Sequence, residues 1–144
     1  MRRLYYIAYP AIAILAFLVY SNTFHAPFVF DDAMYITGNP EIRALSNLWP
    51  LTGTRWLSYI SFALNFRFGG LDVFGYHIVN TAIHAANAVL VFFIVSRTFA
   101  TPWMKGALRS AGAAFGVAFI SSVIFVAHPV QTQAVTYVTQ RFAS

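Results

Sequence analysis

The amino-acid sequence predicts an all-α integral membrane protein with three transmembrane helices. Of the 144 residues, 59% are hydrophobic and 9% are charged, whereas about 25% of the residues in a soluble domain carry a charge. Three stretches contain no charged residue: 27 residues between Arg3 and Asp31, 24 between Asp72 and Arg97, and 31 between Arg109 and Arg141. Each exceeds the roughly 20 apolar residues that a membrane-spanning helix needs. The chain has no cysteine, which excludes a disulfide scaffold and a thiolate metal site.

The first predicted span covers residues 4–20. Arg2 and Arg3 precede it, and tyrosines near its start suit the boundary between membrane and water. The apolar run is longer than that of a secretory signal peptide, and no small-residue cleavage site stands before a polar stretch. We therefore expect an uncleaved signal anchor in which Pro10 is tolerated inside the helix.

Residues 21–72 form a polar loop that contains all four acidic residues of the chain. Within this loop, the segment 56–66 (WLSYISFALNF) repeats apolar side chains at steps of three and four residues. Such spacing predicts a juxtamembrane amphipathic helix. Gly69 and Gly70 follow the segment, and we expect the helix to end there.

The second and third predicted spans cover residues 74–95 and 111–127. The loop between them, 97–109, carries three basic residues and no acid, whereas the 21–72 loop has a net charge of −1. Because basic loops stay on the cytoplasmic side, we expect the amino terminus and 97–109 to be cytoplasmic, and the 21–72 loop and the 128–144 tail to be external. The formal net charge of +5 is then a topology signal, and nucleic-acid binding is not predicted.

An acid pair, Asp31 and Asp32, follows the first span on the predicted external side. Adjacent carboxylates repel, so that one of them can acquire a raised pKa and act as a general base. The pair could also hold a divalent cation, for which oxygen ligands are suited. A structural alternative is a helix cap, in which an aspartate binds free backbone N–H groups.

A polar stripe runs along the second span and consists of His77, Asn80, His84 and Asn87. At 100° per residue these side chains fall within an arc of about 80°. A stripe of this kind lines an aqueous cavity or forms hydrogen bonds between helices. The two histidines lie about 10.5 Å apart along the helix axis, too far for one metal ion. A haem between His84 and His128 is a minor alternative.

Three segments together resemble a known family: FDDAMYITGNPEIR, RWLSYISFALNFRFGGLDVFGYHIVNTAIHAANAVLVFF and FVAHPVQTQAVTYVTQR, in this order. The chain resembles the N-terminal part of GT-C type membrane glycosyltransferases with tetratricopeptide repeats. The animal members are transmembrane and tetratricopeptide-repeat O-mannosyltransferases. The likeness extends from about residue 20 to 144 and looks most like a bacterial-type member, which implies a bacterial inner membrane.

The resemblance implies a lipid-linked sugar donor, a protein acceptor and a partial GT-C fold. Asp31 is then the preferred base for the acceptor hydroxyl, and Asp32 orients it or holds a cation. The resemblance also implies a set of residues that bind the donor's phosphate and sugar: Arg55, His128 and Arg141, with His77 and His84 as lining side chains. One departure is Gln133, where many members have glutamate.

A second departure is size, because GT-C transferases have nine or more membrane helices and this sequence has three candidates. We therefore expect a fragment, a truncated product or a small relative of the family. The primary hypothesis is the N-terminal portion of a polyprenyl-phosphate-sugar-dependent protein O-glycosyltransferase, with membrane lipids around it. The alternative is a non-catalytic subunit that packs against other membrane subunits.

Overall fold

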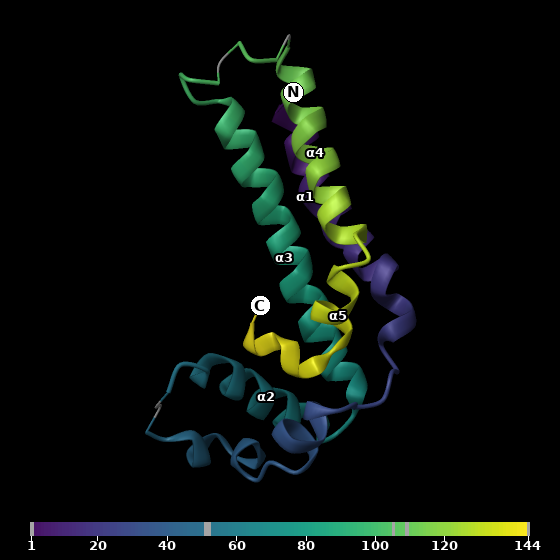
Figure 1. The fold of residues 1–144 in the computed structure, drawn as a ribbon, viewed down its shortest axis with the longest axis vertical. Helices are drawn as coiled ribbons and strands as arrows, with labels where there is room; N and C mark the ends of the chain where they lie inside the picture. Colours follow the sequence, from purple (N-terminus) through teal and green to yellow (C-terminus); the bar gives the residue numbers. More distant parts are fainter. Residues whose placement is uncertain (1, 51–52, 105, 109, 144) are drawn as a thin grey trace. The chain divides into compact units, whose positions relative to one another are not determined.

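The computed structural model describes residues 2–50, 53–104, 106–108 and 110–143, and every regular element within them is helical (Figure 1). The longer elements are α1 (Arg2–Tyr20), α2 (Trp56–Gly69), α3 (Val73–Phe99), α4 (Ala111–Ala127) and α5 (Gln131–Thr136). Short helical turns connect them: η1 (Ser21–Thr23), η2 (Ala33–Thr37), η3 (Glu41–Arg43), η4 (Leu45–Leu48) and η5 (Val138–Phe142).

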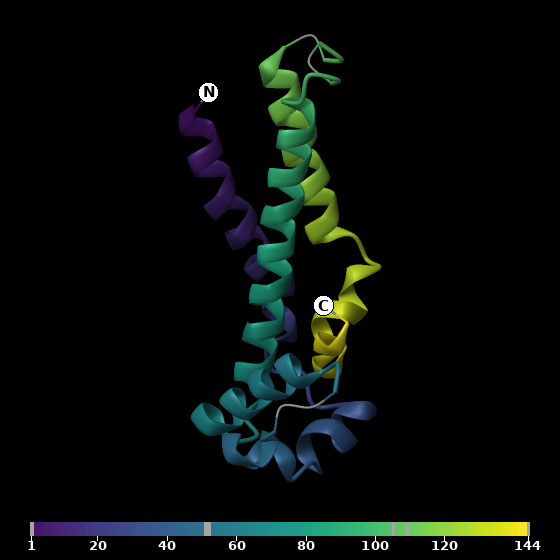
Figure 2. The same ribbon diagram turned by 90° about the vertical axis from the view of Figure 1, so that its left-hand side faces the viewer.

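The chain divides into two compact units, each made of two separate stretches of sequence. The three-helix unit comprises Met1–Ser21 and Ala82–Gln131, and the loop unit comprises Asn22–Thr81 and Thr132–Ser144. Helix α3 is continuous and belongs to both, with Thr81 as its last residue in the loop unit (Figure 2).

The three-helix unit contains α1, most of α3, and α4. Its buried core combines small and aromatic side chains from all three helices: Ala8, Ile12, Ala16, Ala85, Ala88, Phe92, Ala118 and Val126. Small residues allow helix backbones to approach closely, as they do in membrane proteins. Large apolar side chains such as Ile14, Ile94 and Ile120 are more than half exposed, as expected for surfaces that face lipid.

Two helices are long and apolar enough to cross a membrane, Arg3–Thr23 and Val73–Phe99. They agree with the first two predicted spans. The third predicted span coincides with α4, an apolar helix of 17 residues that is too short to count among these two. It is about 25 Å long at 1.5 Å per residue, against a hydrocarbon core of about 30 Å. The charge-free stretch does not continue as helix because Pro129 favours an extended residue before it, and His128 has φ −67° and ψ 128°.

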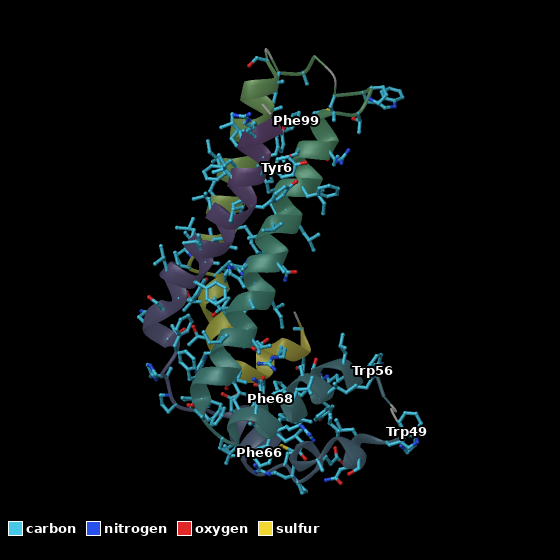
Figure 3. All side chains as sticks on the ribbon, turned by 180° about the vertical axis from the view of Figure 1, so that it is seen from behind. Tyr6, Trp49, Trp56, Phe66, Phe68 and Phe99 are labelled. Atoms are coloured by element: carbon cyan, nitrogen blue, oxygen red, sulfur yellow. The ribbon has the colours of Figure 1, made fainter. Side chains whose placement is uncertain are left out.

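The loop unit packs α2, the short turns, the start of α3 and the tail around an apolar core. Its buried members are Ile36, Ile42, Phe62, Ala63, Tyr76 and Val138. Trp49 and Trp56 lie at the edge of this unit, where both border one pocket (Figure 3). The tail thus completes a core whose other buried residues come from positions 36–76.

Helix α2 confirms the predicted helix at 56–66 and extends it to Gly69. The predicted amphipathic character is wrong. Phe62 is buried in the core, but Leu57 and Phe68 are 67% and 85% exposed on the other side of the helix. The three- and four-residue spacing includes the buried Ala63 but also Trp56, which is 42% exposed, and it misses Phe62. The opposite face is apolar as well, unlike that of an interfacial helix.

Candidate functional site

The two adjacent carboxylates, Asp31 and Asp32, have different environments. Asp32 is 1% exposed, and its Oδ1 accepts a hydrogen bond from the backbone N–H of Thr139 at 2.9 Å. Its Oδ2 accepts a second from the N–H of Val29 at 3.2 Å. Asp31 is exposed to solvent. One carboxylate is therefore fixed in the fold, and the other is exposed to solvent.

The backbone immediately before the acid pair is strained. Phe30 has φ of 48°, a conformation that a bulky side chain adopts rarely. Its side chain is 82% exposed, with its ring centroid 6.0 Å from that of Tyr137. Strained residues of this kind cost about 1–3 kcal/mol and cluster at functional sites, so the turn that presents Asp31 is a strong candidate for function.

Arg141 is the central polar residue of the loop unit. It is 4% exposed, and its Nε donates to Asn80 Oδ1 at 2.8 Å. Its Nη1 donates to Ser61 Oγ at 3.0 Å and Asn65 Oδ1 at 2.8 Å, and its Nη2 donates to the carbonyl of Tyr76 at 2.9 Å. Four of the five N–H groups of the guanidinium are thus used within the protein.

Burial lowers the pKa of Arg141 to about 10, because removal from water penalises its charged form. The positive charge is balanced by oriented dipoles, since its hydrogen-bond partners are two amide oxygens, a hydroxyl and a carbonyl. The guanidinium also lies 4.6 Å from the centroid of the Phe62 ring, a cation–π contact. These contacts make Arg141 a residue that joins α2, α3 and the tail.

Asn80 provides the second connection between α3 and the tail. Its Nδ2 donates to the carbonyls of Tyr137 at 3.0 Å and Val135 at 3.2 Å, while its Oδ1 accepts from Arg141. One turn earlier, His77 is 1% exposed, with its Nε2 2.9 Å from the carbonyl of Ala26. In the loop unit the predicted polar stripe therefore forms hydrogen bonds with the protein, which was the structural alternative.

Two aromatic rings in contact connect Arg55 with Arg141. Its guanidinium is 4.9 Å from the centroid of Phe142, whose ring packs 5.4 Å from that of Phe62, the ring under Arg141. Unlike Arg141, Arg55 is exposed. The loop unit thus contains Asp31, Asp32, Arg55, His77 and Arg141 of the predicted site.

The other predicted histidines belong to the three-helix unit. His84 is buried, stacked on Phe125 with centroids 5.0 Å apart, and its Nε2 lies 3.4 Å from the carbonyl of Val126. His128 is exposed after the end of α4, where its Nδ1 accepts from the N–H of Val130 at 3.2 Å. A haem iron bound through Nε2 would displace this contact of His84, whereas the hydrogen bond of His128 uses its other ring nitrogen.

Divalent cations require several oxygen ligands. Within the part of the chain that the structure describes, no three His, Asp or Glu side chains group closely enough to hold a metal ion. The acid pair offers little more, because both oxygens of Asp32 accept backbone hydrogen bonds. The geometry therefore suits Asp32 to a structural role.

Sequence analysis missed the residues of α2 that receive the Arg141 guanidinium, Ser61 and Asn65. Ser58 belongs with them, since its hydroxyl donates to the backbone carbonyl of Arg141 at 3.1 Å. These three positions lie at steps of three and four residues on α2. A polar strip at helical spacing within an otherwise apolar helix is the signal that could have revealed them.

The chain is apolar and all-helical in its described part, with two helices able to span a membrane. Its homologues are membrane protein glycosyltransferases. The chain is 39% identical over 137 residues to Protein O-mannosyl-transferase Tmtc1 of Drosophila melanogaster, covering 84% of this chain and 14% of that protein. It is 35% identical over 144 residues to Protein O-mannosyl-transferase Tmtc2 of the same organism, covering 88% and 14%. Identity to human Protein O-mannosyl-transferase TMTC4 is 26% over 144 residues, covering 88% and 19%.

These relatives confirm the resemblance at the level of protein O-mannosyl-transferases. The chain spans between 14% and 19% of the length of these three relatives. All three come from animals, so the bacterial type and the bacterial inner membrane stay predictions. No family model matches the chain, and no solved structure matches it.

Proposed function

We propose that this chain is the N-terminal membrane portion of a protein O-glycosyltransferase. The sugar, mannose by analogy with the relatives' names, moves from a polyprenyl or dolichyl phosphate to a hydroxyl group of a protein. The observation that carries the proposal is the division within the acid pair. Asp32 is buried and bound to two backbone N–H groups, while Asp31 is exposed beside it.

The proposed topology has three membrane spans. Helix α4 is the third, accommodated by local thinning of the bilayer, which costs only fractions of a kcal/mol per ångström of mismatch. The amino terminus and the 97–109 loop are cytoplasmic because they carry basic residues without acids. The loop unit then lies on the external or lumenal side, where the lipid-linked sugar and the acceptor protein meet.

In the proposed reaction, the Asp31 carboxylate takes the proton of the acceptor hydroxyl as its oxygen attacks the anomeric carbon of the sugar. The new bond forms as the bond between that carbon and the phosphate oxygen breaks, and the lipid phosphate leaves with the electron pair. Arg55 and His128 are the exposed members of the phosphate-binding set. Arg141, His77 and His84 are buried with protein partners, and we assign them to positioning.

The test is transfer of labelled mannose from a polyprenyl-phosphate donor to an acceptor protein by the intact native protein in proteoliposomes. Asp31→Asn should lower the transfer rate at least about 100-fold, as expected for loss of a general base. Asp72→Asn is the matched control, because Asp72 is an exposed acid that caps α3 through Phe74 N–H at 3.1 Å, and asparagine caps equally well. Full activity of Asp31→Asn would contradict the assignment.

A non-catalytic membrane subunit is the second candidate. It is favoured by Asn87 of the predicted polar stripe, which is partly exposed on an otherwise apolar part of α3 and is available to a partner helix. In that case Asp31→Asn leaves transfer unchanged, while Asn87→Ala disrupts assembly with partner subunits. Co-purification from native membranes, with the intact mass of the protein that contains this chain, separates the two.

A further inference from the structure

A pocket in the three-helix unit is lined by none of the residues of the proposed reaction. It has a volume of about 300 Å³ and lies between the first turns of α1 and the last turns of α3. Its main lining residues are Tyr5, Tyr6 and Tyr9 from α1 and Phe93, Ser96 and Arg97 from α3. All of them belong to the same compact unit.

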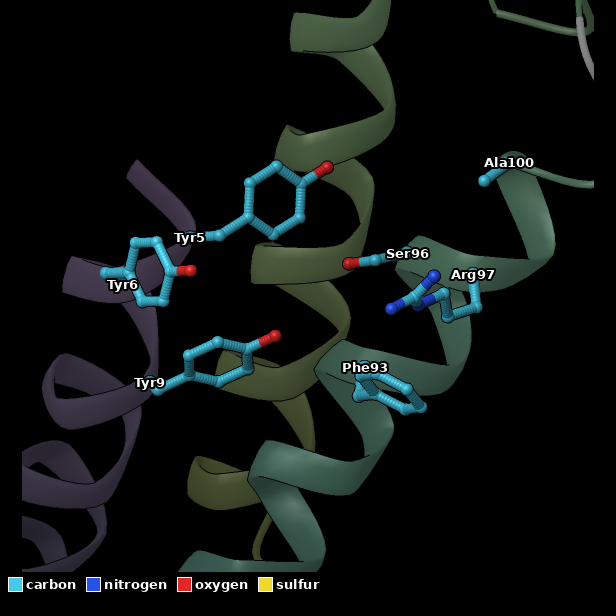
Figure 4. A pocket seen from close by; sticks show the side chains of 7 residues that line it. All are labelled: Tyr5, Tyr6, Tyr9, Phe93, Ser96, Arg97 and Ala100. Carbon is cyan, nitrogen blue, oxygen red and sulfur yellow. The ribbon is translucent and has the colours of Figure 1, made fainter. Parts of the chain in front are cut away.

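The polar groups of this pocket converge on one space. Figure 4 shows the three tyrosine hydroxyls directed from α1 toward α3, with Ser96 and the guanidinium of Arg97 directed back. The rings of Tyr5 and Tyr9 pack against Phe92 with centroids 5.6 and 5.5 Å apart. These contacts hold the two hydroxyls in place, so a ligand would meet donors that are already oriented.

The electrostatics of the pocket favour an anion. All four acids of the chain lie between residues 31 and 72, outside the unit that forms this pocket. Among the described residues, Arg97 makes no ion pair, and its guanidinium lies 5.0 Å from the centroid of the Phe93 ring. A guanidinium with hydroxyl donors around it matches the several acceptor oxygens of a phosphate group.

The surface next to the pocket favours a lipid as the source of that phosphate. Arg97 is the first charged residue after a stretch of 24 uncharged ones. Just before it on α3, Leu90 and Ile94 are 54% and 59% exposed. Arginine at the end of an apolar helix lies at the depth of lipid headgroups, and exposed aliphatic side chains below it suit acyl chains.

We propose that this pocket binds the phosphate of an anionic phospholipid in the leaflet at the amino-terminal end of α1. Arg97 and the hydroxyls of Tyr5 and Tyr9 hold the phosphate. The acyl chains follow the exposed side of α3 past Ile94 and Leu90. Because the acids of the proposed reaction lie in the loop unit, this site is independent of sugar transfer.

The experiment uses native mass spectrometry of the intact protein in mixed micelles of phosphatidylglycerol and phosphatidylcholine. The measured quantity is the ratio of the two lipids that stay bound. Wild type should retain phosphatidylglycerol preferentially, and Arg97→Gln should lower that preference about fivefold, as expected for loss of one cation near a membrane surface. Arg67→Gln is the matched control, because Arg67 is also an exposed arginine in the last turn of a helix, and it should leave the preference unchanged.

A second variant separates the site from overall charge. Tyr5→Phe with Tyr9→Phe keeps the aromatic packing and the net charge, and should also lower the preference for phosphatidylglycerol. An unchanged preference in this double variant or in Arg97→Gln would overturn the proposal, as would an equal loss in Arg67→Gln. Addition of inorganic phosphate should not displace the lipid, and displacement would instead assign the pocket to a soluble phosphate.

Discussion

The two units of this chain are stabilised in different ways. The three-helix unit has a core of alanines and aromatic rings, in which Ala85, Ala88 and Ala118 let the helices approach closely. The loop unit adds to its apolar core a buried arginine whose partners come from α2 and α3. The difference indicates that helices, whose backbone hydrogen bonds are internal, rely mainly on packing with few added bonds such as that from the Tyr20 hydroxyl to the carbonyl of Val126. An irregular loop needs more directed hydrogen bonds to fix its backbone.

The largest effect should come from Arg141→Ala. It leaves Asn80 Oδ1, Asn65 Oδ1 and the carbonyl of Tyr76 without their donor. Since each unsatisfied buried group costs about 1–3 kcal/mol, we expect the loop unit to lose about 3–5 kcal/mol of stability. Amide hydrogen exchange measures this loss, and α4 should keep its protection. Equal loss of protection in α4 would break the proposed contrast between the units.

A medium effect is expected from Ala88→Leu in the three-helix unit. Ala88 is fully buried, and a larger side chain there forces the helices apart at a cost of about 1–3 kcal/mol. Exchange protection should fall in α1 and α4 and stay unchanged in α2. Ala86→Leu is the control, because Ala86 is an exposed alanine on the same helix and should tolerate leucine.

The smallest effect concerns Tyr59 in α2 and appears only in alkaline solution. Burial and the negative charge of Glu41 raise the pKa of Tyr59 above 10.0. The folded state therefore holds this proton more tightly than the unfolded state, and the stability that it contributes is present below pH 10 and lost as pH rises through the folded pKa. Denaturant midpoints at pH 9, 10 and 11 should fall less steeply in Tyr59→Phe than in wild type. Parallel curves would contradict this pKa shift.

The three long apolar helices could be predicted well from sequence because most of each lies within a stretch without charge. The end of α4 at Ala127 was also predictable, since Pro129 restricts the residue before it. Helix α4 has 17 residues, so the third predicted span is less clear than the other two because its helix is short. The opposite face of α2 was predicted wrongly because the spacing of its buried residues says nothing of the residues between them.

The candidate site was harder to predict, because its residues meet through contacts distant in sequence. Asp32 and Thr139 are 107 positions apart, and Arg141 lies 61 positions from Asn80. Sequence reasoning gave Arg141 an external phosphate as its partner, since nothing local indicated the oxygen atoms of α2 and α3. The structural alternative for the acid pair fits Asp32, which accepts hydrogen bonds from backbone N–H groups, whereas the base role of Asp31 stays a prediction.

The split composition of the loop unit has a consequence for the order of events on the ribosome. The residues between its two stretches, 82–131, number 50, and at about 5–20 residues per second their synthesis takes roughly 3–10 s. Throughout that interval Asp32 and Asn80 have already been made, but Thr139 and Arg141, which bind them, have not. During this interval the nascent chain exposes a loop unit that still lacks its C-terminal stretch. A chaperone that binds this unit would act in this interval.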